Sequence, residues 1–82
     1  MLVRVKLFAQ LRDVTGRGDI TVEIEPETST VDAVWQALVV AHPELQKFGT
    51  SVSSAVNDEY AKRHTIVRAG DEVAFLPPVS GG

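Results

Sequence analysis

The chain has 82 residues, 44% of them hydrophobic and 23% charged, and its eight basic and eleven acidic residues give a net charge of −3 at pH 7. This size and composition indicate one small globular domain, and the acidic charge without a Lys/Arg stripe argues against a nucleic-acid partner. With no cysteine and only two histidines, the sequence excludes a disulfide framework, a thiolate metal site and a cysteine nucleophile.

The N-terminal quarter predicts two strands. Apolar residues at alternate positions predict the first strand over residues 2–8, with one buried and one exposed face. A short helical turn over residues 9–14 and a glycine loop over residues 15–19 precede a second alternating strand over residues 20–25. The two strands predict an antiparallel hairpin. Charges interrupt the first apolar residues, so we expect no signal peptide, no membrane span and a cytoplasmic location.

The next segment predicts one main helix. Pro26 ends the second strand because it has no backbone donor, and the hydroxyls of residues 28–30 are suited to capping the first free N–H groups of a helix. Apolar residues at helical spacing predict that helix over residues 31–42. Pro43 ends it, and a short second turn follows as far as Gly49.

The last third predicts a return to the sheet. A weaker strand over residues 52–56 leads into a tight turn at residues 57–59, and one short strand is expected before the final strand, although residues 60–67 are poorly specified. A turn at residues 68–71 precedes a final strand over residues 72–76. A hairpin, a crossover helix and a strand returning to the sheet centre predict an α+β grasp-type roll, with a mixed sheet on one helix.

No conventional catalytic pattern is present. Gly16-Arg17-Gly18 lacks the third glycine of a dinucleotide-binding loop and does not lead from a strand into a helix. His42 and His64 are expected at the surface, and the adjacent carboxylates at residues 58–59 and 71–72 are expected to be solvated rather than paired. We therefore expect no catalytic site within the chain and no bound cofactor or metal.

The C-terminal segment, Leu76-Pro77-Pro78-Val79-Ser80-Gly81-Gly82, is unusual for a chain end. The prolines favour an extended conformation, so residues 1–76 are expected to form the domain and residues 77–82 a projecting flexible tail. Gly81 lacks a Cβ and would pass through a narrow channel, which would bring the Gly82 carboxylate to a partner's active site as the reactive group. A frayed terminus is the alternative.

Three segments carry a family resemblance: residues 8–12 (Phe-Ala-Gln-Leu-Arg), residues 55–57 (Ala-Val-Asn) and, most specifically, residues 70–82. They resemble the small, sulfur-carrier subunit of molybdopterin synthase, and the likeness spans the chain in order and length. It implies a ubiquitin-like β-grasp fold, which agrees with the predicted roll.

The resemblance also implies a function in molybdenum cofactor biosynthesis. A ubiquitin-activating-type enzyme would use ATP to adenylate the Gly82 carboxylate, and a persulfide-derived sulfur would displace AMP to leave a thiocarboxylate. The large synthase subunit would then deliver this sulfur to cyclic pyranopterin monophosphate. The family arrangement is a heterotetramer with two carriers, and this chain would be its non-catalytic member.

Alternation along the strands places Phe8 and Leu76 on the face opposite the predicted core, as candidates for an exposed apolar patch. The resemblance implies partner contacts at positions matching Phe8, Tyr60 and Leu76, and we assign Pro77 and Pro78 to the same contact. Tyr60 departs from the aliphatic residue often found there, but an aromatic ring also suits an interface. The alternative is that Phe8 and Leu76 complete the core.

Other functions remain open at this stage. A carrier of the same fold could serve thiamine synthesis, tRNA thiolation or cysteine biosynthesis, with the same tail chemistry. A ubiquitin-like modifier joined to lysines would use Gly-Gly equally well, and a passive interaction module would have an inert tail.

Overall fold

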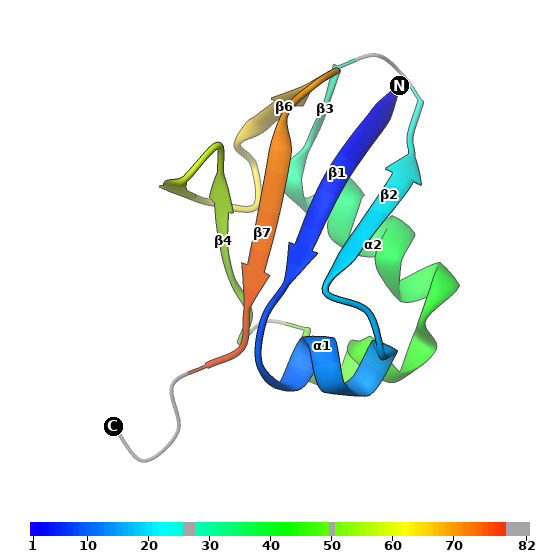
Figure 1. Cartoon of the computed structure of the whole chain (residues 1–82). Helices are drawn as coiled ribbons and strands as arrows, with labels where there is room; N and C mark the ends of the chain where they lie inside the picture. The colour runs from blue at the N-terminus through cyan, green and yellow to red at the C-terminus, as the bar shows by residue number, and fades with distance from the viewer. Residues whose placement is uncertain (26–27, 50, 79–82) are drawn as a thin grey trace.

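The computed structural model describes residues 1–25, 28–49 and 51–78 (Figure 1). Gly81 and Gly82 lie outside these residues, as does Pro26. The elements in chain order are β1 (Leu2–Leu7), α1 (Gln10–Thr15), β2 (Asp19–Glu23), β3 (Thr28–Thr30), α2 (Val31–Ala41), the 3-10 helix η1 (Pro43–Phe48), β4 (Ser53–Val56), β5 (Glu59–Ala61), β6 (Ile66–Arg68) and β7 (Glu72–Leu76).

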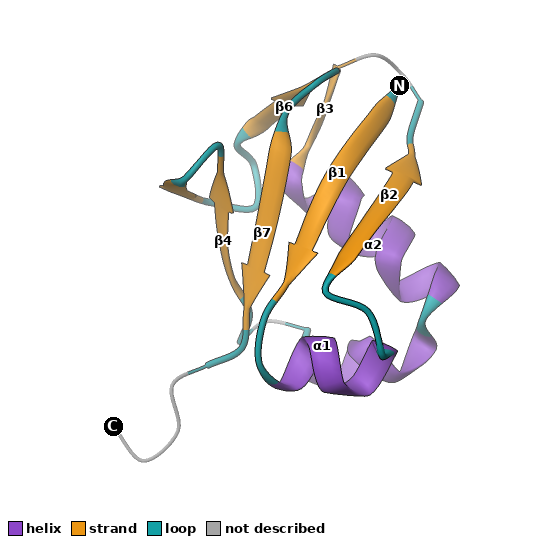
Figure 2. Ribbon diagram, in the orientation of Figure 1, coloured by secondary structure: helices purple, strands orange, loops and turns teal. Residues whose placement is uncertain are grey.

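The main sheet has five strands in the order β2-β1-β7-β4-β5, and β3 pairs with β6 in a separate two-stranded sheet. The pairing of β1 with β7 is parallel, whereas the other pairs in the main sheet are antiparallel. Helix α2 lies across one face of the sheet and leaves the other face open (Figure 2). The predicted hairpin, mixed sheet, main helix and central final strand are therefore confirmed.

The core forms between the sheet and α2. Trp35 of α2 packs on Phe75 of β7, with ring centroids 5.0 Å apart and planes tilted by 58°. Offset or tilted geometry of this kind is the favoured arrangement for an aromatic pair. The buried apolar residues are Val3, Val5, Leu7, Leu11, Val22, Ile24, Val31, Val34, Trp35, Leu38, Leu45, Val52, Val67, Val73 and Phe75.

Helix α2 begins at the predicted Val31 and ends one residue before the predicted limit at residue 42. The Thr30 hydroxyl accepts a hydrogen bond from the Ala33 N–H at 3.2 Å, which satisfies one of the free donors of the first turn. The helix ends at Ala41, before Pro43. Among the described residues, no helix is long and apolar enough to cross a membrane.

The prediction gave one short strand between the turn after β4 and the final strand, where the structure has two, and it missed β3. Residues 28–30 were expected only to cap α2, but they also form β3, which pairs with β6. Strands β5 and β6 occupy most of the poorly specified segment. Each of these strands has three residues, which is too short for alternation to reveal, and β3 finds its partner far along the chain.

One hydrogen-bond network joins the β4–β5 turn to the β6–β7 turn. Asn57 has a φ of 50° and, through its side-chain amide, donates to Asp71 Oδ1 at 3.0 Å, while its own Oδ1 accepts the Glu72 N–H at 3.0 Å. The Arg68 N–H donates to Asp71 Oδ2 at 2.8 Å. The backbone bond from Arg68, then the bond from Asn57, lowers the pKa of Asp71 below its ordinary value of 3.8. The network fixes where β7 begins.

Replacing Asp71 with Asn should reduce the free energy of unfolding at pH 7 by about 0.5–1 kcal/mol, a small effect because the carboxylate is near solvent. A depressed folded-state pKa adds stability above the unfolded-state pKa, and this stability is lost as the pH falls through the folded-state value. The deficit should therefore be smaller in urea unfolding at about pH 2.5 than at pH 7. Asp58→Asn, at a neighbouring turn position, is the control. A deficit of the same size at both pH values would contradict the assignment.

Candidate functional site

The candidate site lies where β1 and β7 end side by side. In the parallel register Leu7 lies opposite Phe75, and the Phe8 N–H donates to the Phe75 carbonyl at 3.3 Å. Phe8 and Leu76, which come directly after this pair, therefore lie at the same end of the sheet. Both follow buried residues, and alternation turns them toward the open face.

The strand register extends this surface across the sheet. Ala74 of β7 lies opposite Ala55 of β4, which in turn lies opposite Tyr60 of β5. Ala74 lies between the buried residues Val73 and Phe75, so it shares the open face with Leu76, and its cross-strand partners Ala55 and Tyr60 lie on that same face. We call Phe8, Ala55, Tyr60, Ala74 and Leu76 the outer-face patch.

Burial distinguishes the two interpretations of these residues. The Phe8 side chain is 44% exposed and that of Tyr60 is 86% exposed, and neither joins the core cluster. Leu76 is half-buried at the end of β7 and is also outside that cluster. The alternative in which Phe8 and Leu76 complete the core is therefore wrong for Phe8 and unsupported for Leu76.

The chain leaves the sheet directly from this patch. Pro77 is half-buried and Pro78 is exposed, and neither belongs to a strand. The predicted domain limit at residue 76 coincides with the last residue of β7. Gly81 and Gly82, the residues expected to carry the chemistry, follow Pro78 by three and four positions.

Ala55 and Ala74 are the patch residues that the functional prediction missed. Both are half-buried, and their small side chains lie between Tyr60 on one side and β1 on the other. Alternation along β7 places Ala74 with Leu76, but only the β4–β7 register shows that Ala55 continues the same surface. Small residues here leave a shallow apolar floor between larger side chains.

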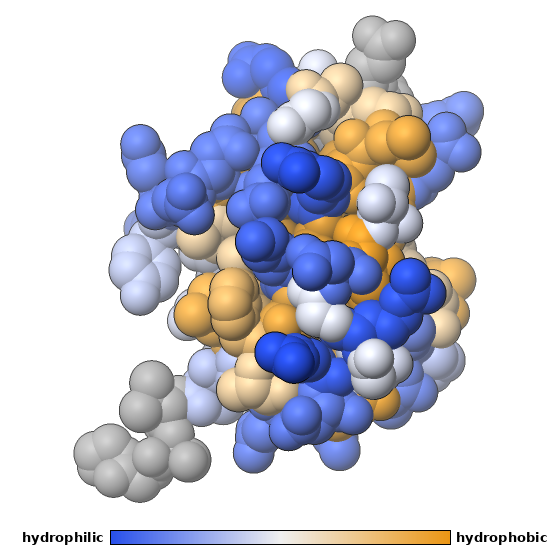
Figure 3. Space-filling model, viewed as in Figure 1, coloured by the Kyte–Doolittle hydropathy of each residue, from blue (hydrophilic) through white to orange (hydrophobic). Residues whose placement is uncertain are grey.

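Charged residues border the patch. Arg4 on β1 lies opposite Glu72 on β7, and Arg4 Nη2 lies 3.6 Å from Glu72 Oε2. Figure 3, which views the open face of the sheet, shows hydrophilic residues over β1 and apolar surface near the end of β7. An apolar centre with a polar rim is typical of protein–protein interfaces.

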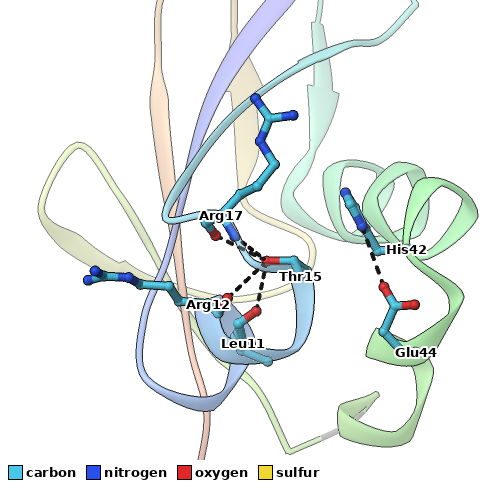
Figure 4. Close-up of polar contacts among 6 residues, drawn as sticks. All are labelled: Leu11, Arg12, Thr15, Arg17, His42 and Glu44. Carbon is cyan, nitrogen blue, oxygen red and sulfur yellow. Dashed lines mark hydrogen bonds and ion pairs between the residues drawn. The ribbon is translucent and has the colours of Figure 1, made fainter.

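The remaining polar groups form structural contacts. His42 Nδ1 lies 3.4 Å from Glu44 Oε1 at the end of α2, as Figure 4 shows, and His64 is exposed. Arg63 donates to Asp32 Oδ1 at 2.9 Å and to the Gly49 carbonyl, and lies 5.4 Å above the Trp35 ring. Across residues 1–25, 28–49 and 51–78, no three His, Asp or Glu side chains are grouped to hold a metal ion.

Comparisons with known proteins agree over the full chain. The model of the ThiS family matches residues 5–82. The molybdopterin synthase sulfur carrier subunit of Arabidopsis thaliana is 39% identical over 80 residues, covering 98% of this chain and 82% of that protein. Small archaeal modifier protein 1 of Haloferax volcanii is also 39% identical, over 85 residues, covering 94% of this chain and 97% of that protein.

Solved structures give the same fold. The crystal structure of SAMP1 from Haloferax volcanii matches with a TM-score of 0.86 at 37% identity, over 100% of both chains. A chain of the Amycolatopsis orientalis BexX/CysO complex matches with a TM-score of 0.71 at 26% identity, over 98% of this chain and 99% of that one. The expected ubiquitin-like β-grasp fold and the family resemblance are thus confirmed, and the chain belongs to the ThiS family of ubiquitin-like sulfur carriers.

Proposed function

We propose that the chain is the sulfur carrier of molybdenum cofactor biosynthesis, with the Gly82 carboxylate as its reactive group. The observation that supports this most is the point at which the chain leaves the sheet. The chain passes from a central strand into Pro77 and Pro78 beside the exposed outer-face patch. One surface would therefore hold a partner while the adjoining segment enters that partner's active site.

The chemistry requires an activated acyl group. A carboxylate is a poor acyl donor because it has no good leaving group, so the Gly82 oxygen would first attack the α-phosphate of ATP, forming an acyl adenylate and releasing pyrophosphate. The outer sulfur of a persulfide on the activating enzyme would then attack the acyl carbon, and the bond between this carbon and AMP would break. Reduction of the resulting acyl disulfide by a thiol would leave the thiocarboxylate, with the thiol oxidised to a disulfide.

The residues of this chain would supply passage and docking. Gly81 would allow the backbone through a narrow channel because it has no Cβ, and Phe8, Tyr60 and Leu76 would contact the partner. Pro77 and Pro78 would hold the exit extended and reduce the entropy lost when the tail is threaded. General acids and bases would belong to the partner, so the chain would be the non-catalytic subunit of a heterotetramer with the large synthase subunit.

Reconstitution tests the pathway. The thiocarboxylated chain, mixed with the large synthase subunit and cyclic pyranopterin monophosphate, should yield molybdopterin with two carriers consumed per pterin. Parallel reactions with a thiazole synthase or a tRNA-thiolating enzyme are the matched comparisons. Transfer only in one of those reactions would assign the chain to another pathway and contradict the proposal.

A second candidate function is supported by the similarity to small archaeal modifier protein 1, at an identity equal to that of the plant carrier subunit. A modifier would use the same acyl adenylate but would transfer the Gly82 acyl group to a lysine amine, forming an isopeptide bond. Because no Lys or Arg follows Arg68, tryptic digestion would leave residues 69–82 on a modified lysine, and a search for that remnant in cell protein separates the two functions. A carrier that is not a modifier should leave none.

A further inference from the structure

A hollow adjoins the outer-face patch at Phe8. Besides this ring, it is lined by Lys6, Arg12 and Asp19 and by the loop glycines Gly16 and Gly18. The lining comes from the end of β1 and the residue after it, from α1, and from the loop and first residue of β2, so the hollow extends the patch past the end of β1. It places two cationic side chains and one carboxylate beside an exposed aromatic ring.

The structure holds Arg12 in a defined position. A Cβ built on Gly18 would lie 3.4 Å from Arg12 Cδ and 3.6 Å from Nε, so the arginine stem lies over a residue without a side chain. The loop beneath is fixed because the Gly16 N–H donates to the Arg12 carbonyl at 2.8 Å and Thr15 Oγ1 donates to the Leu11 carbonyl at 3.0 Å. Figure 4 shows that the Arg12 and Arg17 side chains point away from each other.

The two cations have no anionic partner among the described residues, although other cations of the chain do. Arg4 pairs with Glu72 and Arg63 pairs with Asp32, whereas no ion pair within residues 1–25, 28–49 and 51–78 includes Lys6 or Arg12. Asp19 lies opposite Lys6 in the strand register without closing an ion pair in this part of the chain. The hollow therefore keeps excess positive charge facing solvent.

Charge is also segregated along the sequence. Residues 1–18 contain four basic residues and one acidic residue, a net charge of +3, whereas residues 19–82 contain four basic and ten acidic residues, a net charge of −6. The basic segment is the one that forms the Phe8 end of the patch. A partner that covers the patch from this end thus meets positive charge on an otherwise acidic protein.

We propose that Lys6 and Arg12 bind carboxylates on an acidic segment of the protein that docks on the outer-face patch, with Arg12 making the specific contact. This rests on the docking assignment of the proposed function. A guanidinium presents paired N–H groups that match a carboxylate, and arginine beside an aromatic ring is typical of energetically dominant interface positions. With Asp19 in the same hollow, the charged lining sums to +1, which suits a single carboxylate better than a polyphosphate chain with several negative charges.

Titration with the large synthase subunit tests the proposal. Arg12→Glu should weaken binding by about 10- to 100-fold, and Arg12→Lys should weaken it less, because the charge remains but the paired donors are lost. Arg17→Glu makes the same charge change on an arginine that does not line the hollow. Its affinity for the large subunit should stay within about threefold of the wild-type value. The wild-type affinity should fall more steeply with salt than that of Arg12→Gln.

The outcomes separate this proposal from the proposed function. If the wild-type chain binds and Arg12→Glu matches Arg17→Glu, the proposal is wrong while the docking function stands. If the wild-type chain does not bind the large subunit, both fail. Retention of a single-stranded oligonucleotide by the wild-type chain, lost in Arg12→Glu, would also overturn the proposal, since the hollow would then be a phosphate site. Matching thermal unfolding of all variants confirms that folding is intact.

Discussion

Removal of Gly82 is expected to abolish sulfur loading of the chain. The truncated chain still ends in a glycine carboxylate, that of Gly81, so its chemistry is unchanged and only its reach differs. One residue spans about 3.3–3.6 Å, and a misplacement of about 1 Å already costs on the order of 100-fold in an oriented reaction. We therefore expect loading, measured as AMP release coupled to a change in protein mass, to fall by at least about 1,000-fold.

A chain extended by one glycine is the matched control, because it displaces the carboxylate by the same distance in the opposite direction. It should fail to the same degree. Gly81→Val keeps both the length and the terminal carboxylate, and it should fail because its side chain obstructs the channel. Normal loading of the truncated chain would show that Gly82 is not the reactive residue.

Replacement of Leu76 with Arg is expected to abolish binding to the large synthase subunit while the domain stays folded. Leu76 is half-buried at the end of β7, outside the core cluster, and it lies on the open face with Ala74. A guanidinium at the centre of an apolar interface must be desolvated without a partner. Substitutions at the centre of an interface reduce the binding free energy by about 2–4 kcal/mol, or roughly 30- to 1,000-fold in affinity.

Val40→Arg is the matched control for Leu76→Arg. Val40 is an exposed apolar residue, 82% accessible, and it belongs to α2, on the far side of the sheet from the patch. The same change in charge there, with a slightly larger gain in volume, should leave binding within about twofold of the wild-type affinity. Equal losses from both variants, or unchanged capture of Leu76→Arg by the large subunit, would contradict the docking assignment.

The elements that depend on sequence patterns within one segment were predicted correctly. The alternation in β1 and β7 gave their buried faces, and Pro43 marked the end of α2. Strand β3 and the presence of two strands, β5 and β6, where one was predicted were missed because three residues carry too little alternation and their pairing depends on tertiary contacts.

The candidate site also has features that local sequence predicts and features that depend on the whole fold. The Gly81-Gly82 ending and the outward direction of Phe8 and Leu76 follow from residue type and alternation. The contribution of Ala55 depends on how β4 is aligned with β7, and the position of Arg12 depends on contact with Gly18. Register and packing of this kind are set by the whole fold and cannot be obtained from spacing along one segment.

Intact-protein mass spectrometry tests the central claim that sulfur is carried on the Gly82 carboxylate. The chain is incubated with ATP, an activating enzyme of the ubiquitin-activating type and a sulfur donor, with a known carrier as positive control for the enzyme. Exchange of one oxygen for sulfur predicts a gain of about 16 Da, absent without ATP and localised to residue 82 by fragmentation. An unchanged mass while the control is loaded, or adducts on lysine in its place, would contradict the claim.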